Sequence, residues 1–270
     1  MQRIAIDGGA LAYAESGSGT PLVLVHGFLL DHSIWDDVAA ALASRGRIVR
    51  PDLRGLGASH ATPSGTTLIE TLASDLAALL DALGVERGTF AGHSLGGYVA
   101  LAFYRMYRER VEALALVGSR VGAPSPQAAG EMLELADRVE REGIGPLVEW
   151  FLPRSFAPSV YDKNPALVER VRALMARTDP ASAAAILRGM AVRVDSSDLL
   201  EEIDVPFLCA LGDQDALVGR AETEATVRAV RGGELALFEG VGHLPMLEEP
   251  DRLGVTLATF FGREARGQLA

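Results

Sequence analysis

The stretch "FAGHSLGGYVA", residues 90–100, joins a short apolar run to a helix-like run through the turn Gly92-x-Ser94-x-Gly96. An apolar strand, this motif and then a helix form the context of a nucleophile elbow, in which a sharp turn exposes the serine hydroxyl. Glycine and serine are also ordinary turn residues, so the motif alone leaves a structural turn serine as an alternative. The choice depends on whether the rest of the chain supplies a base, an acid and an oxyanion site.

Short apolar runs alternate with longer amphipathic runs on both sides of this motif. Helices are predicted over 34–44, 67–83 and 95–108, and an N-terminal hairpin around Gly8-Gly9. Strand–helix alternation at this interval predicts an α/β fold with a mostly parallel central sheet and helices on both faces. The predicted strands are "PLVLVHG" (21–27), "RIVRPD" (47–52), "GTFAGHS" (88–94), "VEALALVGS" (111–119), "VPFLCALG" (205–212) and "GELALFEG" (233–240).

Residues 121–200 interrupt the alternation with a different pattern. Proline fits the first turn of a helix because its missing N–H would be unpaired there, and a preceding Ser, Asn or Asp caps the helix. Apolar stripes at helical spacing lie between such positions, so the segment is predicted to be an all-helical insertion of four helices. Its helices either pack on the core or form a lid over a pocket. The dipeptides that mark the helix starts are Ser125-Pro126, Gly145-Pro146, Asn164-Pro165 and Asp179-Pro180.

Composition narrows the class of protein. The chain has 270 residues, of which 49% are hydrophobic, so a sizeable core can be buried. A formal net charge of −11 disfavours nucleic acid and anionic membranes as partners and leaves a small-molecule substrate. The single cysteine, Cys209, lies in an apolar run and can form no intramolecular disulfide. The five histidines lack paired ligand spacing, so no metal site is predicted.

The N-terminal sequence lacks the basic and apolar regions of a signal peptide, and no stretch is long and apolar enough to span a bilayer. A cytoplasmic protein with no membrane partner is therefore predicted. Its oligomeric state is left open.

A serine nucleophile at position 94 needs a base and an acid from elsewhere in the chain. Elbow folds place the three residues in the order serine, acid, histidine. His243, in "EGVGHLPMLEEP", is the only histidine after Ser94, and it is the predicted general base. The acid should follow a strand, and "LCALGDQDALVG" offers Asp213 and Asp215, whereas "LALVGSR" holds no carboxylate. At this point both aspartates remain candidates.

An oxyanion site needs two backbone N–H groups. Leu95 directly follows the serine and supplies one. Phe28, in the loop after "PLVLV", is the candidate for the second, with His26 in a structural hydrogen-bonding role. His93, inside the elbow, is expected to point away from the cavity.

Four other polar residues are expected to have ordinary structural roles. His32 and His60 are interpreted as polar loop residues. Asp52 and Arg54, in "RPDLRGLGAS", are expected to fix their loop with a local ion pair, because the segment lacks the third glycine of a dinucleotide-binding fingerprint and the Lys-Ser/Thr of a P-loop.

The motifs "HGF", "PDLRGLGAS", "AGHSLGG", "GDQDALV" and "GHLPMLEEP", in this order, resemble those of the α/β-hydrolase superfamily. The resemblance is to its branch of serine esterases, enol-lactonases and cofactor-free haloperoxidase-like enzymes. It implies Ser94 as nucleophile, Asp215 rather than Asp213 as acid, and His243 as base. Residues 121–200 stand where the family carries a helical cap, between core segments 1–120 and 201–270. A lid over the pocket is therefore the favoured reading of the insertion.

Two features of the sequence differ from particular branches of this superfamily and narrow the set of enzymes that the chain resembles. Serine at the elbow separates the chain from haloalkane dehalogenases and epoxide hydrolases, which use aspartate there. "HGFLLD" lacks the Gly-Pro-Gly that often marks hydrolases of carbon–carbon bonds.

The predicted function is a serine hydrolase that cleaves a carboxylic ester or lactone of a small to medium apolar substrate through an acyl-enzyme, without a cofactor. The alternatives are a lyase, C–C hydrolase or perhydrolase with the same triad, and a small-molecule receptor that keeps the triad but turns over little. The predicted pocket walls are Leu29, Trp150, Leu217, Val218 and Leu244.

Overall fold

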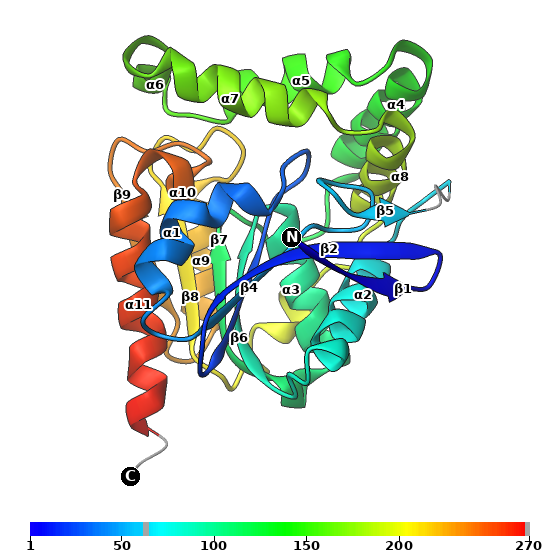
Figure 1. Ribbon diagram of the computed structural model, residues 1–270. Helices are drawn as coiled ribbons and strands as arrows, with labels where there is room; N and C mark the ends of the chain where they lie inside the picture. Colours follow the sequence, from blue (N-terminus) through cyan, green and yellow to red (C-terminus); the bar gives the residue numbers. More distant parts are fainter. Residues whose placement is uncertain (62–64, 268–270) are drawn as a thin grey trace.

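The computed structural model describes residues 1–61 and 65–267 (Figure 1). A single sheet runs through the core in the order β1-β2-β4-β3-β6-β7-β8-β9, with β5 beside β2. The pairs from β4 to β9 are parallel, and β2 pairs antiparallel with β1, β4 and β5. The strands are β1 (Gln2–Ile6), β2 (Gly9–Gly17), β3 (Pro21–Val25), β4 (Arg47–Pro51), β5 (His60–Ala61), β6 (Gly88–His93), β7 (Val111–Val117), β8 (Phe207–Gly212) and β9 (Glu234–Phe238).

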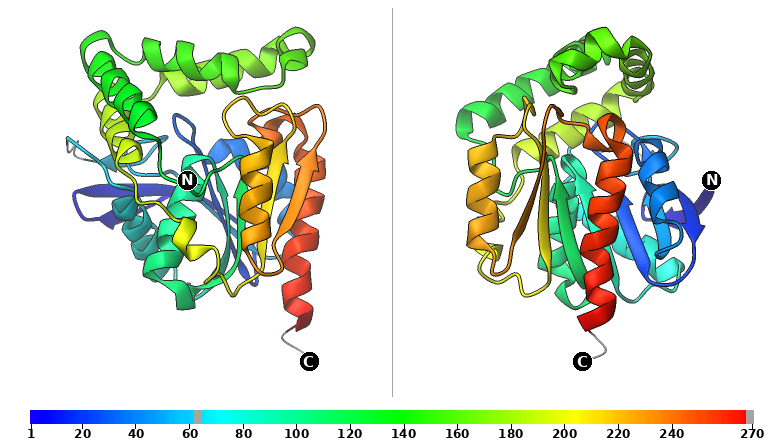
Figure 2. Two further views of the ribbon diagram at one scale, coloured as in Figure 1. Left: turned by 180° about the vertical axis from the view of Figure 1, so that it is seen from behind. Right: turned by 90° about the vertical axis from the view of Figure 1, so that its left-hand side faces the viewer.

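Helices cover both faces of the sheet (Figure 2). The contacting pair α1 and α11 lies on one face, while α2, α3 and α9 lie on the other. All residues of β6 and β8 are buried, which is why both segments are continuous apolar runs in the sequence. The core helices are α1 (Asp36–Leu42), α2 (Ile69–Ala82), α3 (Leu95–Met106), α9 (Arg220–Ala229), α10 (Pro245–Glu248) and α11 (Pro250–Gly267). The predicted α/β fold is confirmed.

A helical cap is inserted between β7 and β8, and it lies above the carboxyl ends of the parallel strands (Figure 1). Three helices of the insertion have the N-capping residue that was predicted. The side chains of Ser125, Asn164 and Asp179 accept hydrogen bonds from the backbone N–H groups three residues further along, at 3.2, 3.2 and 2.8 Å. The cap helices are α4 (Pro126–Glu142), α5 (Gly145–Phe151), α6 (Pro158–Lys163), α7 (Pro165–Ala176) and α8 (Pro180–Ala191).

The predicted number of helices in the insertion is wrong. Five α-helices, rather than four, lie between β7 and β8, a stretch that the structure describes throughout. The additional helix, α6, begins at Pro158 after Ala157, which has no side-chain oxygen to cap it. Without a capping residue, its six residues carry no start signal beyond the proline.

The strand order reverses beside β3, where β4 lies on one side and β6 on the other. In open parallel sheets, ligands bind at the carboxyl edge near such a reversal. Val25 of β3 pairs with Gly92 of β6, so the loops after these two strands begin side by side. The segments that hold Phe28 and Ser94 therefore start at the same edge. In the described part of the chain, no helix combines the length and apolar composition needed to cross a bilayer.

Candidate active site

Ser94 occupies a strained turn between β6 and α3. Its φ of +50° and ψ of −113° lie outside the regions that non-glycine residues normally adopt, a geometry typical of the turn in a nucleophile elbow. The turn brings β3 and α3 so close that a Cβ on Gly96 would lie 2.3 Å from the carbonyl oxygen of Val25. Glycine at position 96 is therefore required by the close approach of the two backbones.

His243 and Asp215 come together at the carboxyl edge of the sheet. Nδ1 of His243 lies 2.8 Å from Oδ2 of Asp215, and the Asp215 side chain is completely buried. The other carboxylate oxygen, Oδ1, accepts from the N–H groups of Leu217 and Val218 at 2.8 and 2.9 Å. With Nδ1–H donated to the carboxylate, Nε2 of the neutral imidazole keeps its lone pair.

Asp213 lies in the same loop but does not contact His243. Its Oδ1 accepts from the N–H of Gly240 at 2.7 Å, and the residue is exposed. Asp213 thus ties the loop after β8 to the loop after β9, whereas Asp215 contacts the imidazole.

Ser94 and His243 line one cavity of about 350 Å³ beneath the cap. No hydrogen bond joins the Ser94 hydroxyl to His243 within the described residues, and such bonds are often long until substrate binds. Trp150, Leu217 and Val218, three of the predicted walls, line this cavity, together with Met132, Leu135, Phe151, Leu187 and Met190 of the cap helices. Leu29 lines a second cavity, of about 550 Å³, that contains none of the three candidate residues. Leu244 is buried and lines neither.

The loop after β3 carries Phe28, the expected second oxyanion donor. Within the described chain, the N–H groups of Phe28 and Leu95 have no backbone or side-chain acceptor, so both are available to a ligand. His26 shapes this loop: its Nε2 accepts from the N–H of Leu53 at 2.9 Å and its Nδ1–H donates to the carbonyl of Gly27 at 2.8 Å. Burial lowers the pKa of His26, so the ring stays neutral in this role.

His93 supports the His243 loop from below. Its Nε2–H donates to the backbone carbonyl of His243 at 2.9 Å, and the two ring centroids lie 4.7 Å apart. Burial holds the pKa of His93 well below its usual value, and His243 lowers it further. His93 is not among the residues that line the cavity. Its contact with His243 was not predicted from the sequence, because the two positions are 150 residues apart in the chain.

Glu248 is a second residue that sequence reasoning missed. Its carboxylate accepts from the N–H groups of Gly242 at 3.0 Å and Leu244 at 3.4 Å, on either side of His243. It also accepts from the N–H of Ala157 in the cap at 3.1 Å. Burial raises the pKa of Glu248. One side chain thus fixes the His243 loop and binds the cap to it.

We expect Glu248→Ala to lower kcat/KM by about 10- to 100-fold, because a small displacement of a catalytic group has effects of this size. Glu248→Gln keeps one carbonyl oxygen as an acceptor and should lose less. Steady-state kinetics on a chromogenic ester measure the effect, and Glu249→Gln, at an exposed neighbouring position, is the control. Equal activity of Glu248→Ala and the control would exclude this positioning role.

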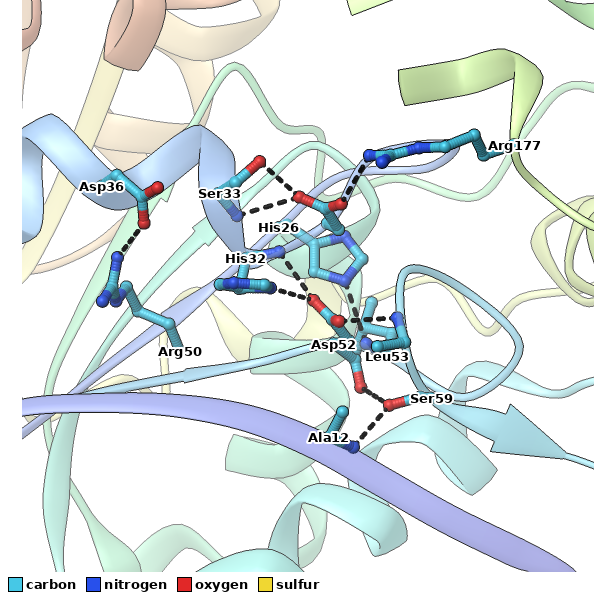
Figure 3. A network of polar contacts seen from close by, with 12 residues as sticks. Ala12, His26, His32, Ser33, Asp36, Arg50, Asp52, Leu53, Ser59 and Arg177 are labelled. Carbon is cyan, nitrogen blue, oxygen red and sulfur yellow. Dashed lines mark hydrogen bonds and ion pairs between the residues drawn. The ribbon is translucent and has the colours of Figure 1, made fainter. Parts of the chain in front are cut away.

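A polar network lies next to the Phe28 loop (Figure 3). Nδ1 of His32 contacts Oδ1 of Asp52 at 2.8 Å, and Oδ2 of Asp52 accepts from the N–H of Ala58 at 2.8 Å. Arg54 instead binds Asp75 of α2 through two hydrogen bonds, at 2.5 and 2.6 Å. The expected local ion pair of Asp52 with Arg54 is therefore wrong, as is the reading of His32 as an ordinary loop residue.

This network contains a group of side chains that could in principle hold a metal ion. The ligand-type atoms of Asp31, His32 and Asp52 lie within 4.8 Å of one another. Their carboxylates already have partners: Asp31 accepts from Ser33 and contacts Arg177 of the cap, and Asp52 accepts from His32 and Ala58. The group therefore holds loops together, and nothing in it points to a bound ion.

The His32–Asp52 pair gives stability a defined pH dependence. The hydrogen bond that His32 donates to Asp52 raises the pKa of His32 above its usual 6.5. A raised folded-state pKa stabilises the protein fully below the unfolded value, and this contribution is lost as pH rises through the raised pKa. We therefore expect His32→Gln to reduce the free energy of unfolding by about 1–2 kcal/mol near pH 6 and by less near pH 9.

Urea titrations at the two pH values measure this difference. His60→Gln, which alters an exposed histidine outside this pair, is the control. A destabilisation by His32→Gln that is equal at both pH values would contradict the charged pair.

Comparison with known proteins places this geometry in a family. A model of the alpha/beta hydrolase family matches residues 22–254. The chain belongs to the alpha/beta hydrolase family. The resemblance deduced from the five motifs is thereby confirmed, and a hydrolase of ester bonds, the expected class of enzyme, agrees with the family and with the relatives below.

This α/β-hydrolase is similar to an esterase from Thermogutta terrifontis, solved with malate bound, at 35% identity over 98% of this chain and 99% of that one, with a TM-score of 0.94. An enol-lactonase from Burkholderia xenovorans is 26% identical over 97% of this chain and 100% of its own, with a TM-score of 0.89. A 3-oxoadipate enol-lactonase from Acinetobacter baylyi is 26% identical over 89% of each chain.

Proposed function

We propose that this α/β-hydrolase is a serine hydrolase that cleaves a carboxylic ester or lactone of small to medium size through an acyl-enzyme. The observation that carries the proposal is the 2.8 Å contact of His243 Nδ1 with the buried Asp215 carboxylate, next to a cavity that His243 shares with Ser94. This arrangement suits a Ser-His-Asp triad in the chain order of elbow folds.

Each of the three residues has a chemical role in this mechanism. Nε2 of His243 takes the proton of the Ser94 hydroxyl while Oγ attacks the carbonyl carbon. Asp215 holds the imidazole in the required tautomer and stabilises the imidazolium that forms. His243 then gives the proton to the leaving alcohol, which departs as the acyl-enzyme forms. A water activated by His243 attacks the acyl-enzyme and releases the acid.

The N–H groups of Phe28 and Leu95 hold the tetrahedral oxyanion. Leu95 is the first residue of α3, so the positive end of the helix dipole adds to its hydrogen bond. Loss of one such donor from an oxyanion hole costs about 10²- to 10³-fold in kcat.

The cap sets the size of the substrate. The cavity of about 350 Å³ is at the small end of ligand pockets, and cap residues such as Met132, Trp150 and Phe151 form much of its wall. These apolar walls favour a small to medium acyl chain. The residue limits of the cap, 121–200, stay a prediction, as do the core segments 1–120 and 201–270.

A panel of chromogenic esters and lactones, combined with fluorophosphonate labelling and mass spectrometry, tests the proposal. We expect turnover of at least one class and a covalent adduct on Ser94. Slow turnover with ligand binding that survives Ser94→Ala would instead favour a receptor. The absence of both turnover and labelling at Ser94 would refute the serine-hydrolase mechanism.

A further inference from the structure

One wall of the active-site cavity holds a buried cation without an anionic partner. Arg193 follows α8, is 8% exposed and lines the cavity. Its guanidinium donates to the backbone carbonyls of Met190 at 3.2 Å and Gly122 at 2.5 Å, and it lies 4.2 Å from the centroid of the Tyr98 ring. Its Nε is buried and has no acceptor. Within the described residues, Arg193 forms no ion pair with a carboxylate.

Other partly buried arginines of the chain are paired. Arg54 binds Asp75, and Arg188 binds Asp137 and Glu140. Arg193 differs because its hydrogen bonds and its ring contact are all to neutral groups, whereas the carboxylates of Glu222 and Asp195 attract it only from beyond ion-pair distance. Burial lowers the pKa of its guanidinium. A buried charge is costly unless an opposite charge accompanies it, so this position favours an anion from outside the chain.

The carboxylates that line the cavity already have partners. Glu222 contacts Arg120 at 3.6 Å, at the half-exposed rim, where Arg120 also donates to the carbonyl of Leu217. Glu131 is exposed and accepts from Gln127. Among the described residues, Arg193 is therefore the charged group of this cavity with no carboxylate in direct contact, while Glu222 and Asp195 attract it from further away.

Tyr98 adds a hydrogen-bond donor next to Arg193. It lies four residues after Ser94 on α3, which is about one helical turn, or roughly 5–6 Å along the helix axis. It lines the cavity, and its hydroxyl has no hydrogen-bond partner in the part of the chain that the structure describes. A guanidinium and a phenol hydroxyl on the same wall can bind one carboxylate.

We propose that Arg193 and Tyr98 bind a carboxylate at the far end of the substrate's acyl chain, so that the preferred substrates are half-esters or lactones of short dicarboxylic acids. This inference rests on the proposed ester or lactone hydrolysis and specifies its substrate class. The separation of Ser94 from Tyr98 sets the spacing: about one helical turn between the reacting carbonyl and the carboxylate.

A matched pair of substrates tests the inference. Mono-p-nitrophenyl glutarate and p-nitrophenyl pentanoate have the same leaving group and similar length, and only the first carries a terminal carboxylate. We expect the wild type to prefer the anionic ester by about 10- to 100-fold in kcat/KM, the range of a hydrogen bond to a charged group. Equal rates, or a preference for the neutral ester, would overturn the carboxylate site and leave the serine-hydrolase mechanism intact.

Variants of the wall sharpen the test. Tyr98→Phe keeps the ring beneath Arg193 and should lower the anionic-to-neutral ratio about 3- to 10-fold, the range of one hydrogen bond. Arg193→Gln should abolish most of the preference, and Arg193→Lys should restore part of it. Tyr107→Phe, at the C-cap directly after α3 and outside the cavity lining, should leave the ratio unchanged. A ratio that none of the wall variants changes would contradict the proposed contacts.

A binding measurement does not depend on turnover. Calorimetric titration of Ser94→Ala compares monomethyl glutarate with methyl pentanoate, and we expect at least tenfold tighter binding of the anionic ester. Equal binding would overturn the carboxylate site. Preferential binding of the glutarate ester together with unlabelled Ser94 in the wild type would support the site and reject the serine-hydrolase mechanism, so the two failures are distinguishable.

Discussion

Replacing Ser94 by alanine should lower kcat/KM by about 10⁵-fold for any ester that the protein hydrolyses. The variant loses the only oxygen that can form the acyl-enzyme, while the oxyanion donors Phe28 and Leu95 remain. Residual hydrolysis should come from those donors and from water activated by His243. The methyl side chain of alanine fits the space of the serine, so the fold should be retained.

Steady-state kinetics and fluorophosphonate labelling measure this loss together. Ser74→Ala is a suitable control, because Ser74 is exposed on α2 and its hydroxyl donates, among the described residues, only to the carbonyl of Glu70. Activity of Ser94→Ala within tenfold of the wild type would mean that the ester is attacked by a nucleophile other than Ser94.

Replacing Asp215 by asparagine should lower kcat about 10⁴-fold. The asparagine oxygen can still accept from the N–H groups of Leu217 and Val218, so the loop is expected to keep its shape. The amide NH₂, however, would face Nδ1 of His243 and favour the tautomer with the proton on Nε2. In that tautomer the imidazole cannot take the proton of Ser94.

Asp213→Asn is the matched control for this substitution, since Asp213 lies two residues away and binds Gly240 instead of His243. We expect its kcat to stay within about threefold of the wild type. Comparison of both variants, with circular dichroism to verify folding, separates the two aspartates. A larger loss in Asp213→Asn than in Asp215→Asn would reverse the assignment that the motif resemblance implies.

Local patterns in the sequence predicted most of the fold. Strands such as β6 and β8 are continuous apolar runs because both their faces are covered, and three cap helices start at Ser, Asn or Asp followed by proline. The predictions failed where the local signal was weak. The short helix α6 has no capping residue, so only its proline marks its start in the sequence.

The sequence predicted those parts of the candidate site that follow from the order of the three residues along the chain and from the family motifs. The loop after β8 contains two aspartates, between which chain order cannot choose; the motif resemblance implies Asp215, and in the structure Asp215 contacts His243 whereas Asp213 does not. The supporting contacts of His93 and the partner of Asp52 join residues far apart in sequence, so no spacing rule indicates them. No motif marks Arg193, because its burial without a directly contacting carboxylate depends on packing between distant segments.

The cap holds Glu248 through the backbone N–H of Ala157, a group that every amino acid except proline carries. Side chains throughout the cap can therefore drift during evolution without breaking this link to the His243 loop. Substitutions in the cap residues that line the cavity would then let other acyl groups bind, while Ser94, Asp215 and His243 keep their relative positions.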